Sequence, residues 1–253
     1  MNASQHQRIQ ERFDRESAEW REMYLRSEKS RFAYFDKLYR KRYVLELLGA
    51  GRGNALDLGC GAGMFLEDLR RLGYSPLGMD FSAEMVQLAS RAEAGRRRVV
   101  RADAMALPFG GDSFAAMIAV GLIEYLPEDR ATLAEIFRVL KPGGAAVVTL
   151  RNARCRERRL WKLYRRFGWR DLGRQGFFRE HDRKTFQTLV ERQGFTGFAH
   201  RYCHFYPVPW PFSAWLPHLN GFLAHYWERW FSRSRLDGMG STLICRFQKP
   251  SGA

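Results

Sequence analysis

The chain has 253 residues, 45% of them hydrophobic, and this length suits one α/β domain with additions better than two separate domains. No apolar run approaches the ~20 residues that cross a bilayer, and the first thirty residues lack the apolar core of a secretory signal, so we expect a cytoplasmic protein. The four cysteines include no C-x-x-C pair, which argues against a disulfide framework and a zinc site, so no metal site is predicted.

The net charge of +15 is distributed unevenly along the chain. Residues 1–54 carry a net charge of +4, residues 55–150 carry −2 and residues 151–253 carry +13. Attraction to an anionic surface or to a polyanion is therefore expected in the C-terminal part of the chain and not in its centre.

Helical segments and short apolar segments alternate along most of the chain. Helices are predicted over residues 6–24, 31–49, 63–72, 83–93 and 129–139. Strands are predicted at 54–58, 75–80, 98–102, 114–120 and 145–150, with two final strands at about 197–206 and 239–248. This alternation predicts an α/β fold with a mostly parallel sheet and helices on both of its faces.

A glycine-rich turn follows the first predicted strand, in the segment ALDLGCGAGMF at residues 55–65. Asp57 precedes three glycines that alternate with small residues, namely Gly59, Gly61 and Gly63. Glycines let the backbone turn tightly and approach a ligand, and the N-terminus of the next helix points at the same place. Taken alone, the pattern fits a ligand site and a tight turn without a ligand equally well.

Acidic residues end the next two predicted strands. Asp80 ends the strand at 75–80, and Asp103 follows the strand at 98–102. Because ligands of parallel α/β sheets bind beyond the carboxyl ends of the strands, these acids and the glycine turn share one rim. A carboxylate at Asp80 can accept hydrogen bonds from both hydroxyls of a ribose. The sequence therefore predicts a ligand rich in hydroxyl and amino donors.

Five segments resemble the class I S-adenosylmethionine-dependent methyltransferases, in particular the small-molecule branch that includes ubiquinone and menaquinone methyltransferases. In chain order they are LDLGCGAG, GMDFSAEMVQLA, ADAMALPF, DSFAAMIAVGLIEYL and EIFRVLKPGG. The resemblance covers about residues 50–150 and implies the Rossmann-like fold of that family, with a seven-stranded sheet.

The resemblance also implies that S-adenosylmethionine is the cofactor. Its methionine part would be surrounded by the glycine turn and the residues beside it, namely Asp57, Gly59, Gly61, Gly63 and Ala119. Its adenosine part would be bound by residues at the next two strand ends: Asp80 at the ribose, Phe81 against the adenine, and Asp103 with Ala104 at the adenine amino edge.

Methyl transfer needs little acid–base chemistry, because the methyl group leaves a sulfonium ion that is already activated. Some acceptors must nevertheless lose a proton. By the resemblance, Glu124 and Tyr125 follow the fourth strand at substrate-facing positions, and His181 begins a helix near the substrate pocket. A histidine at a helix start also fits a purely structural role, so both interpretations of His181 stay open.

Residues 151–174 contain ten Arg or Lys residues and two acids. Leu160, Leu163, Tyr164 and Phe167 form an apolar stripe at helical spacing, which predicts a basic amphipathic helix. Such a helix can pack its stripe on the core with its cations in solvent. It can also contact an anionic membrane, an acidic substrate or RNA.

An aromatic insertion at residues 207–238 is predicted between the last two strands, and residues 207–231 hold four of the seven tryptophans. Tryptophan and tyrosine beside arginine are enriched at membrane interfaces, although the same residues can pack over a pocket or against a second subunit. Residues 1–50 are interpreted as an N-terminal helical lid segment, in which Trp20 and Tyr24 are weaker site candidates, and residues 51–253 as the methyltransferase domain.

Together these features predict methyl transfer to a small, apolar or lipid-linked acceptor, with an anionic membrane surface as the hypothetical partner of a peripheral protein. An RNA methyltransferase is the alternative. No N-P-P-Y or D-P-P-Y sequence follows the fourth strand and no Pro-Cys pair is present, which weakens base methylation but leaves ribose methylation open. A protein that binds S-adenosylmethionine without catalysis is the third hypothesis. The acceptor atom and the oligomeric state are not predicted.

Overall fold

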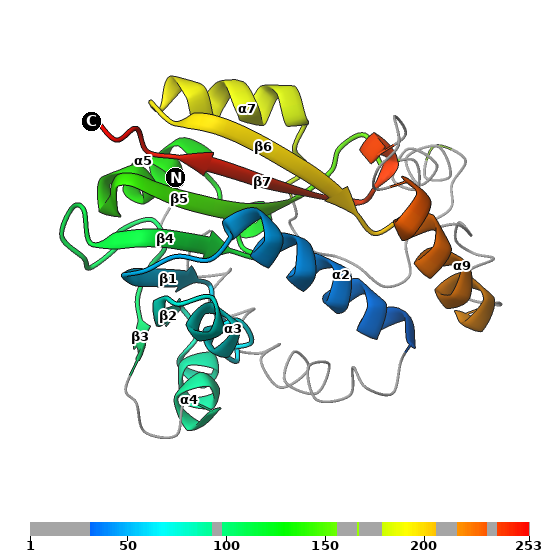
Figure 1. Ribbon diagram of the computed structural model, residues 1–253, viewed down its shortest axis with the longest axis horizontal. Helices are drawn as coiled ribbons and strands as arrows, with labels where there is room; N and C mark the ends of the chain where they lie inside the picture. Colours follow the sequence, from blue (N-terminus) through cyan, green and yellow to red (C-terminus); the bar gives the residue numbers. More distant parts are fainter. Residues whose placement is uncertain are drawn as a thin grey trace.

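A seven-stranded sheet with helices on both faces forms the centre of the computed structural model, which describes residues 31–92, 98–155, 166, 179–205, 217–231 and 237–252 (Figure 1). The strands are β1 (Asn54–Leu58), β2 (Ser75–Asp80), β3 (Val99–Arg101), β4 (Phe114–Ala119), β5 (Leu140–Arg151), β6 (Thr196–Cys203) and β7 (Thr242–Gln248). Their spatial order is β3-β2-β1-β4-β5-β7-β6, and β7 runs antiparallel to the other six strands. The predicted Rossmann-like, mostly parallel sheet is confirmed.

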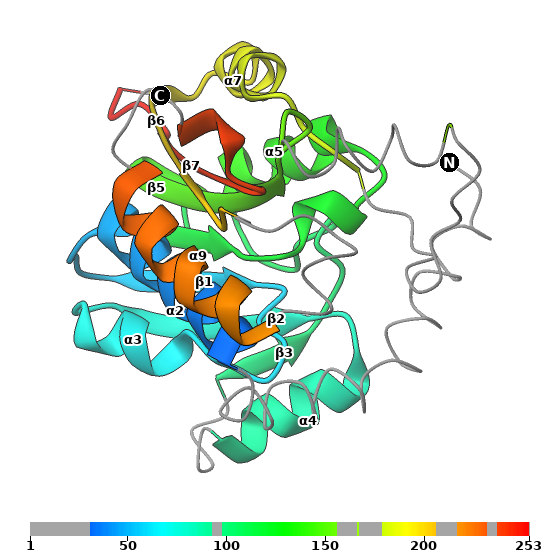
Figure 2. The same cartoon turned by 90° about the vertical axis from the view of Figure 1, so that its right-hand side faces the viewer.

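Helices cover both faces of this sheet. They are α2 (Arg31–Leu48), α3 (Leu66–Arg71), α4 (Ala83–Ala92), α5 (Asp129–Val139), α7 (Arg183–Arg192) and α9 (Pro217–Phe231), with short 3-10 helices η1 (Ile123–Tyr125) and η2 (Asp237–Met239). Helix α2 packs on β5, β6 and β7, whereas α5 contacts β5 and α7 contacts β6. Figures 1 and 2 both show α9 lying alongside α2, with α7 and α5 on the other side of the sheet.

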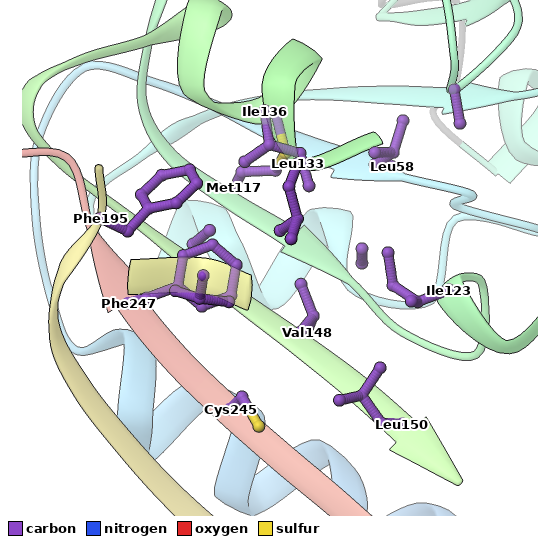
Figure 3. Close-up of a cluster of buried hydrophobic side chains, with 14 of the residues drawn as sticks. Leu58, Met117, Ile123, Leu133, Ile136, Val148, Leu150, Phe195, Cys245 and Phe247 are labelled. Atoms are coloured by element: carbon purple, nitrogen blue, oxygen red, sulfur yellow. The ribbon is translucent and has the colours of Figure 1, made fainter. Parts of the chain in front are cut away.

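The central strands are buried on both faces because successive side chains of a strand point to opposite sides. On β4, Ala116 and Ile118 pack in the hydrophobic cluster with α2 and α3, and Met117 and Ala119 pack in the cluster on the opposite face. This second cluster contains a T-shaped contact between Phe195 and Phe247, whose ring centroids lie 4.7 Å apart (Figure 3). The core therefore holds the sheet rigidly beneath the strand ends.

Some element boundaries differ from the sequence prediction. Helix α3 begins at Leu66 and not at residue 63, because turns occupy residues 61–65, where Gly61 and Gly63 have φ values of 52° and 82°. Strand β5 begins at Leu140, since a pairing with Phe114 precedes a register shift in the β4–β5 ladder. Both differences arise from backbone conformations that hydrophobic periodicity does not detect.

Several predicted segments lie wholly or partly outside the described residues: the helix at 6–24, most of the basic segment 151–174, and residues 207–216 of the aromatic insertion. The basic segment does not begin as a helix, because Arg151 ends β5 and Asn152 forms a β-bridge with His181. Within the interpreted lid segment 1–50, the C-terminal half of α2 packs into the core of the domain, where Tyr43, Val44 and Leu48 are buried. No helix among the described residues is long and apolar enough to cross a membrane.

The aromatic packing beneath β7 yields a stability prediction. Replacing the fully buried Phe247 with Ala removes its contacts with Phe195 and Phe186 and leaves a cavity, so the free energy of unfolding should fall by about 3–5 kcal/mol. Urea denaturation measures this change. The control is Thr196→Ala at the exposed start of β6, which should change stability by no more than about 0.5 kcal/mol. Equal effects of the two substitutions would contradict the described core.

Candidate functional site

A pocket opens at the carboxyl ends of β1, β2, β3 and β4 and encloses about 960 Å³, including its open mouth. Seven of the residues predicted from sequence line it, namely Gly59, Gly61, Asp80, Phe81, Asp103, Ala104 and Tyr125. The other lining residues were not predicted from the sequence; they are Met79, Ser82, Met85, Ala102, Val120, Gly121, Leu122, Leu126 and Pro127. The volume suits a ligand of nucleoside size.

The carboxylate of Asp80 is held in place by two backbone donors. The N–H of Gly61 donates to Oδ2 at 2.8 Å, and the N–H of Ser82 donates to Oδ1 at 2.9 Å. Gly61 reaches this position with a φ of 52°, in the left-handed region that glycine adopts readily. Each carboxylate oxygen can accept a further hydrogen bond, so Asp80 is an oriented acceptor for a ligand at the rim.

The glycines of the turn have different roles. A Cβ added to Gly59 would lie 3.2 Å from the Leu122 side chain, which itself lines the pocket. Gly63 does not line the pocket, and a Cβ there would lie 3.2 Å from Leu66 and 3.3 Å from Ala89. Gly59 therefore allows the pocket wall to close, while Gly63 allows the turn to pack against α3 and α4.

Asp57 is buried and is not one of the lining residues. Burial, together with the negative charge of Asp80, raises the pKa of Asp57 to about 8. Its Oδ2 has no hydrogen-bond partner among the described residues. A neighbouring cation from a ligand would favour the ionised form of this carboxyl group and so compensate its burial.

The other predicted ligand contacts lie at two strand ends. Asp103 accepts a hydrogen bond from the N–H of Met105 at 2.9 Å, which orients its carboxylate at the rim next to Ala104. Ala119 is fully buried in the core and does not line the pocket. Instead, the three residues after it, Val120, Gly121 and Leu122, form this part of the wall.

Only one of the three proposed catalytic residues, Tyr125, lines the pocket. His181 is buried outside it, with Nε2 3.3 Å from both carboxylate oxygens of Asp129 and 3.1 Å from Arg179. Burial would raise the pKa of Asp129, but the hydrogen bond and charge of His181, together with Arg179, lower it overall. These contacts hold His181 against the start of α5.

Glu124 is also buried and lies among charges from other elements. Burial raises the pKa of its carboxyl group, against the opposing charges of Arg40, Arg151 and His181. Arg40 and Arg151 are 84 and 27 residues away from Glu124 in the chain, so sequence spacing could not indicate that they belong near it.

Comparison with known proteins identifies the central part of the chain. Residues 56–148 match a family model described as a methyltransferase domain. The demethylmenaquinone methyltransferase of Clavibacter sepedonicus is 36% identical over 115 residues, which cover 45% of this chain and 47% of that protein. The ubiquinone/menaquinone biosynthesis C-methyltransferase of Geotalea daltonii is 36% identical over 122 residues, covering 45% of this chain and 52% of that protein.

The fold likeness extends further than the sequence likeness. A crystal structure from Thermotoga maritima, described as a SAM-dependent methyltransferase, superposes with a TM-score of 0.65 and 19% identity, covering 95% of this chain and 99% of that one. The matched segment spans about half the length of the curated relatives. The comparisons therefore show that residues 56–148 are similar to a methyltransferase domain and that the fold is shared along most of the chain.

The buried carboxyl group of Asp57 yields a prediction about pH. Its pKa of about 8 in the folded protein exceeds the ordinary 3.8, so the folded state binds a proton that the unfolded state releases between these values. Stability of the ligand-free protein should therefore fall as the pH rises from 4 towards 8. In Asp57→Asn this contribution is absent, and the loss between pH 5 and pH 8 should shrink by roughly 1–3 kcal/mol.

Urea denaturation at several pH values measures this difference. Glu191→Gln, an exposed substitution on α7, is the control and should keep the pH dependence of the native protein. If the free energy of unfolding changes with pH in the same way in Asp57→Asn and in the native protein, the assignment of a raised pKa to Asp57 is contradicted.

Proposed function

We infer that this chain is a class I methyltransferase built around the methyltransferase domain of residues 56–148, and that it transfers a methyl group from S-adenosylmethionine to a small apolar or lipid-linked acceptor. The observation that carries this proposal is the pair of oriented carboxylates, Asp80 and Asp103, on the rim of a pocket beside a glycine turn.

The adenosine part of the cofactor fits the β2 and β3 side of the pocket. Asp80 would accept hydrogen bonds from the ribose hydroxyls, and Phe81 would lie against the adenine. Asp103 would accept from the adenine amino group, next to Ala104. None of the described lining residues is Lys or Arg, so the acidic rim suits a nucleoside without phosphate groups and disfavours a dinucleotide.

The methionine part fits the opposite side of the pocket, beside the glycine turn and the residues that follow β4. S-adenosylmethionine carries an ammonium group and a sulfonium ion there. Positive charge close to Asp57 would draw the pKa of its carboxyl group down from about 8, which explains why a buried acid is tolerated at this position. Gly59 and Gly61 allow the backbone to approach this end of the ligand.

The main task of the protein in methyl transfer is to position the acceptor relative to the cofactor. When bound, the cofactor supplies an activated methyl group. The chain must hold the acceptor in line with that group and exclude water. Tyr125, Leu126 and Pro127 form the wall nearest to the space left for the acceptor, and the phenol of Tyr125 can orient its reacting group.

The proposal of an apolar acceptor rests on the names of two relatives and on the exposed aromatic side chains of this chain. Two relatives carry menaquinone or demethylmenaquinone in their names, and such acceptors are apolar. Neither name mentions a nucleic acid. A lipid-linked acceptor also explains why a chain with a net charge of +15 exposes large aromatic side chains.

We propose that one surface of α9 and α2 contacts an anionic membrane, and we name it the α9 surface. It comprises Leu38, Tyr226 and Trp230, which are 44%, 49% and 76% exposed, with the exposed Arg229 beside them. Tyr226 and Trp230 are four residues apart and share one side of α9. Trp227, by contrast, packs against the core. Exposed aromatics next to a cation are typical of interfacial helices.

The cofactor site is tested by Asp80→Ala. This substitution removes an acceptor of two charge-assisted hydrogen bonds, so affinity for S-adenosylmethionine should fall by roughly 2–4 kcal/mol, or about 30- to 1,000-fold. Calorimetric titration measures it. Asp112→Asn is the control, because Asp112 is exposed, lies outside the pocket and has a φ of 54° that Asn tolerates. Unchanged affinity in Asp80→Ala would rule out the proposed site.

Cosedimentation with vesicles tests the α9 surface. Replacing Trp230 with Ala removes apolar area worth roughly 1.5–3 kcal/mol, so partitioning onto anionic vesicles should weaken about tenfold or more. Adding Tyr226→Ala should weaken it further. Binding should also decline as salt rises, and vesicles of neutral lipid are the control. If the protein does not bind vesicles, and binds RNA equally well with and without both substitutions, the nucleic-acid alternative is favoured instead.

A further inference from the structure

A cluster of charged side chains lies beside the part of the pocket left for the methyl group. With adenosine over β2 and β3, the strand order places the other end of the cofactor towards β4 and β5. Val120, Gly121 and Leu122 line the pocket there. A Cβ built on Gly121 would lie 4.0 Å from Nη1 of Arg40, so the guanidinium of this α2 residue lies next to the pocket wall.

Glu124 is the acid at the centre of this cluster. It is 9% exposed, and its Oε2 has no hydrogen-bond partner within the described part of the chain. Arg40 from α2, Arg151 from the end of β5, and His181 from the β-bridge each act on it electrostatically. The next residue, Tyr125, lines the pocket, so Glu124 lies directly behind the wall.

Backbone hydrogen bonds hold these groups in place. The N–H of Arg179 donates to the carbonyl of Glu124 at 2.8 Å, and the N–H of His181 donates to the carbonyl of Arg151 at 2.8 Å. Asp129 engages the side chains of Arg179 and His181. Asp129 is therefore paired within the protein, whereas Oε2 of Glu124 is buried without a hydrogen-bond partner among the described residues.

We propose that this cluster is the proton-transfer site for the acceptor, in which Glu124 takes the proton of a phenolic or enolic hydroxyl and Arg40 and Arg151 bind the resulting oxyanion. The proposal rests on the proposed function and deepens it by specifying the reacting group of the acceptor. It requires the acceptor, or a small movement of the wall at Tyr125, to bring the hydroxyl within reach of Glu124.

The step balances without a further reactant. The O–H bond breaks, its electron pair stays on oxygen, and the proton goes to Glu124. In O-methylation, an electron pair on that oxygen forms the bond to the methyl carbon. In C-methylation, an electron pair on the carbon conjugated with the oxygen forms this bond. The sulfur–methyl bond breaks and its pair stays on sulfur. In the carbon case, the proton on the attacked carbon then leaves and the oxygen is protonated again. Either way, one proton passes to solvent.

The charges distinguish a hydroxyl from other acceptor groups. Two guanidinium groups would repel an ammonium ion, and the buried carboxylate would repel a phosphate or a carboxylate. A phenol or enol enters uncharged and becomes negative only after losing its proton. Burial raises the pKa of Glu124 above its ordinary value, which makes its carboxylate a stronger base.

The charge assignment is tested by binding 4-nitrophenol, whose anion has its own visible absorbance, to protein saturated with S-adenosylhomocysteine. The bound probe should ionise at lower pH than the free probe. Arg40→Gln and Arg151→Gln should each weaken phenolate binding about tenfold. Glu124→Gln should tighten it several-fold, since a competing negative charge is gone. Arg42→Gln, on the exposed side of α2, is the matched control and should change nothing.

Turnover tests the proton acceptor. With 1-naphthol as the acceptor, Glu124→Gln should form S-adenosylhomocysteine at least about 100-fold more slowly, while its affinity for S-adenosylmethionine stays within twofold of native. Glu124→Asp should recover part of the rate. A native rate in Glu124→Gln, no product from the native protein, or phenolate binding indifferent to both arginines overturns the proposal. Failure of the native protein to bind S-adenosylmethionine would instead overturn the proposed function itself.

Discussion

The candidate site depends on the two hydrogen bonds that join the glycine turn to the end of β2. The N–H groups of Gly61 and Ser82 each donate to one oxygen of the Asp80 carboxylate. These two hydrogen bonds fix both the path of the turn and the orientation of the carboxylate. Carboxylates bound by two backbone N–H groups are held in a fixed orientation. The turn also positions Asp57 and Gly59, and through Gly59 it positions Leu122 on the next strand end. The pocket wall therefore follows from the same contact.

The sheet and the place of the pocket could be predicted from the sequence, for a physical reason. Strand ends, glycine turns and acids such as Asp80 and Asp103 are local signals, and a parallel sheet brings consecutive strand ends to one edge. Long-range packing was not predictable in the same way. The approach of Arg40 to the β4 end depends on how α2 packs on the sheet. The wall residues Val120–Leu122 were not predicted from sequence, and Ala119, which the resemblance placed beside the methionine part, is buried in the core.

The site is electrostatically divided along the sheet. Acids line the pocket over β2 and β3, where donor groups of a nucleoside are expected, and Arg40 approaches the pocket wall beyond β4. By the proposals above, the cationic end of the cofactor lies beside Asp57 and the glycine turn, and an acceptor that becomes anionic lies nearest to the arginines. Since charges in a partly buried site are weakly screened, this arrangement favours the neutralisation that accompanies methyl transfer.

The two ends of the connection between β6 and β7 lie next to each other in the sheet. Cys203 and Thr242 face each other in the antiparallel ladder, so the chain leaves the sheet and returns to it side by side, with α9 between. Because the ends of the connection are adjacent, its length can change at little entropic cost, about 0.6 kcal/mol for each doubling of its length. The length and sequence of this connection can therefore change while the pairing of β6 with β7, and with it the sheet, stays the same.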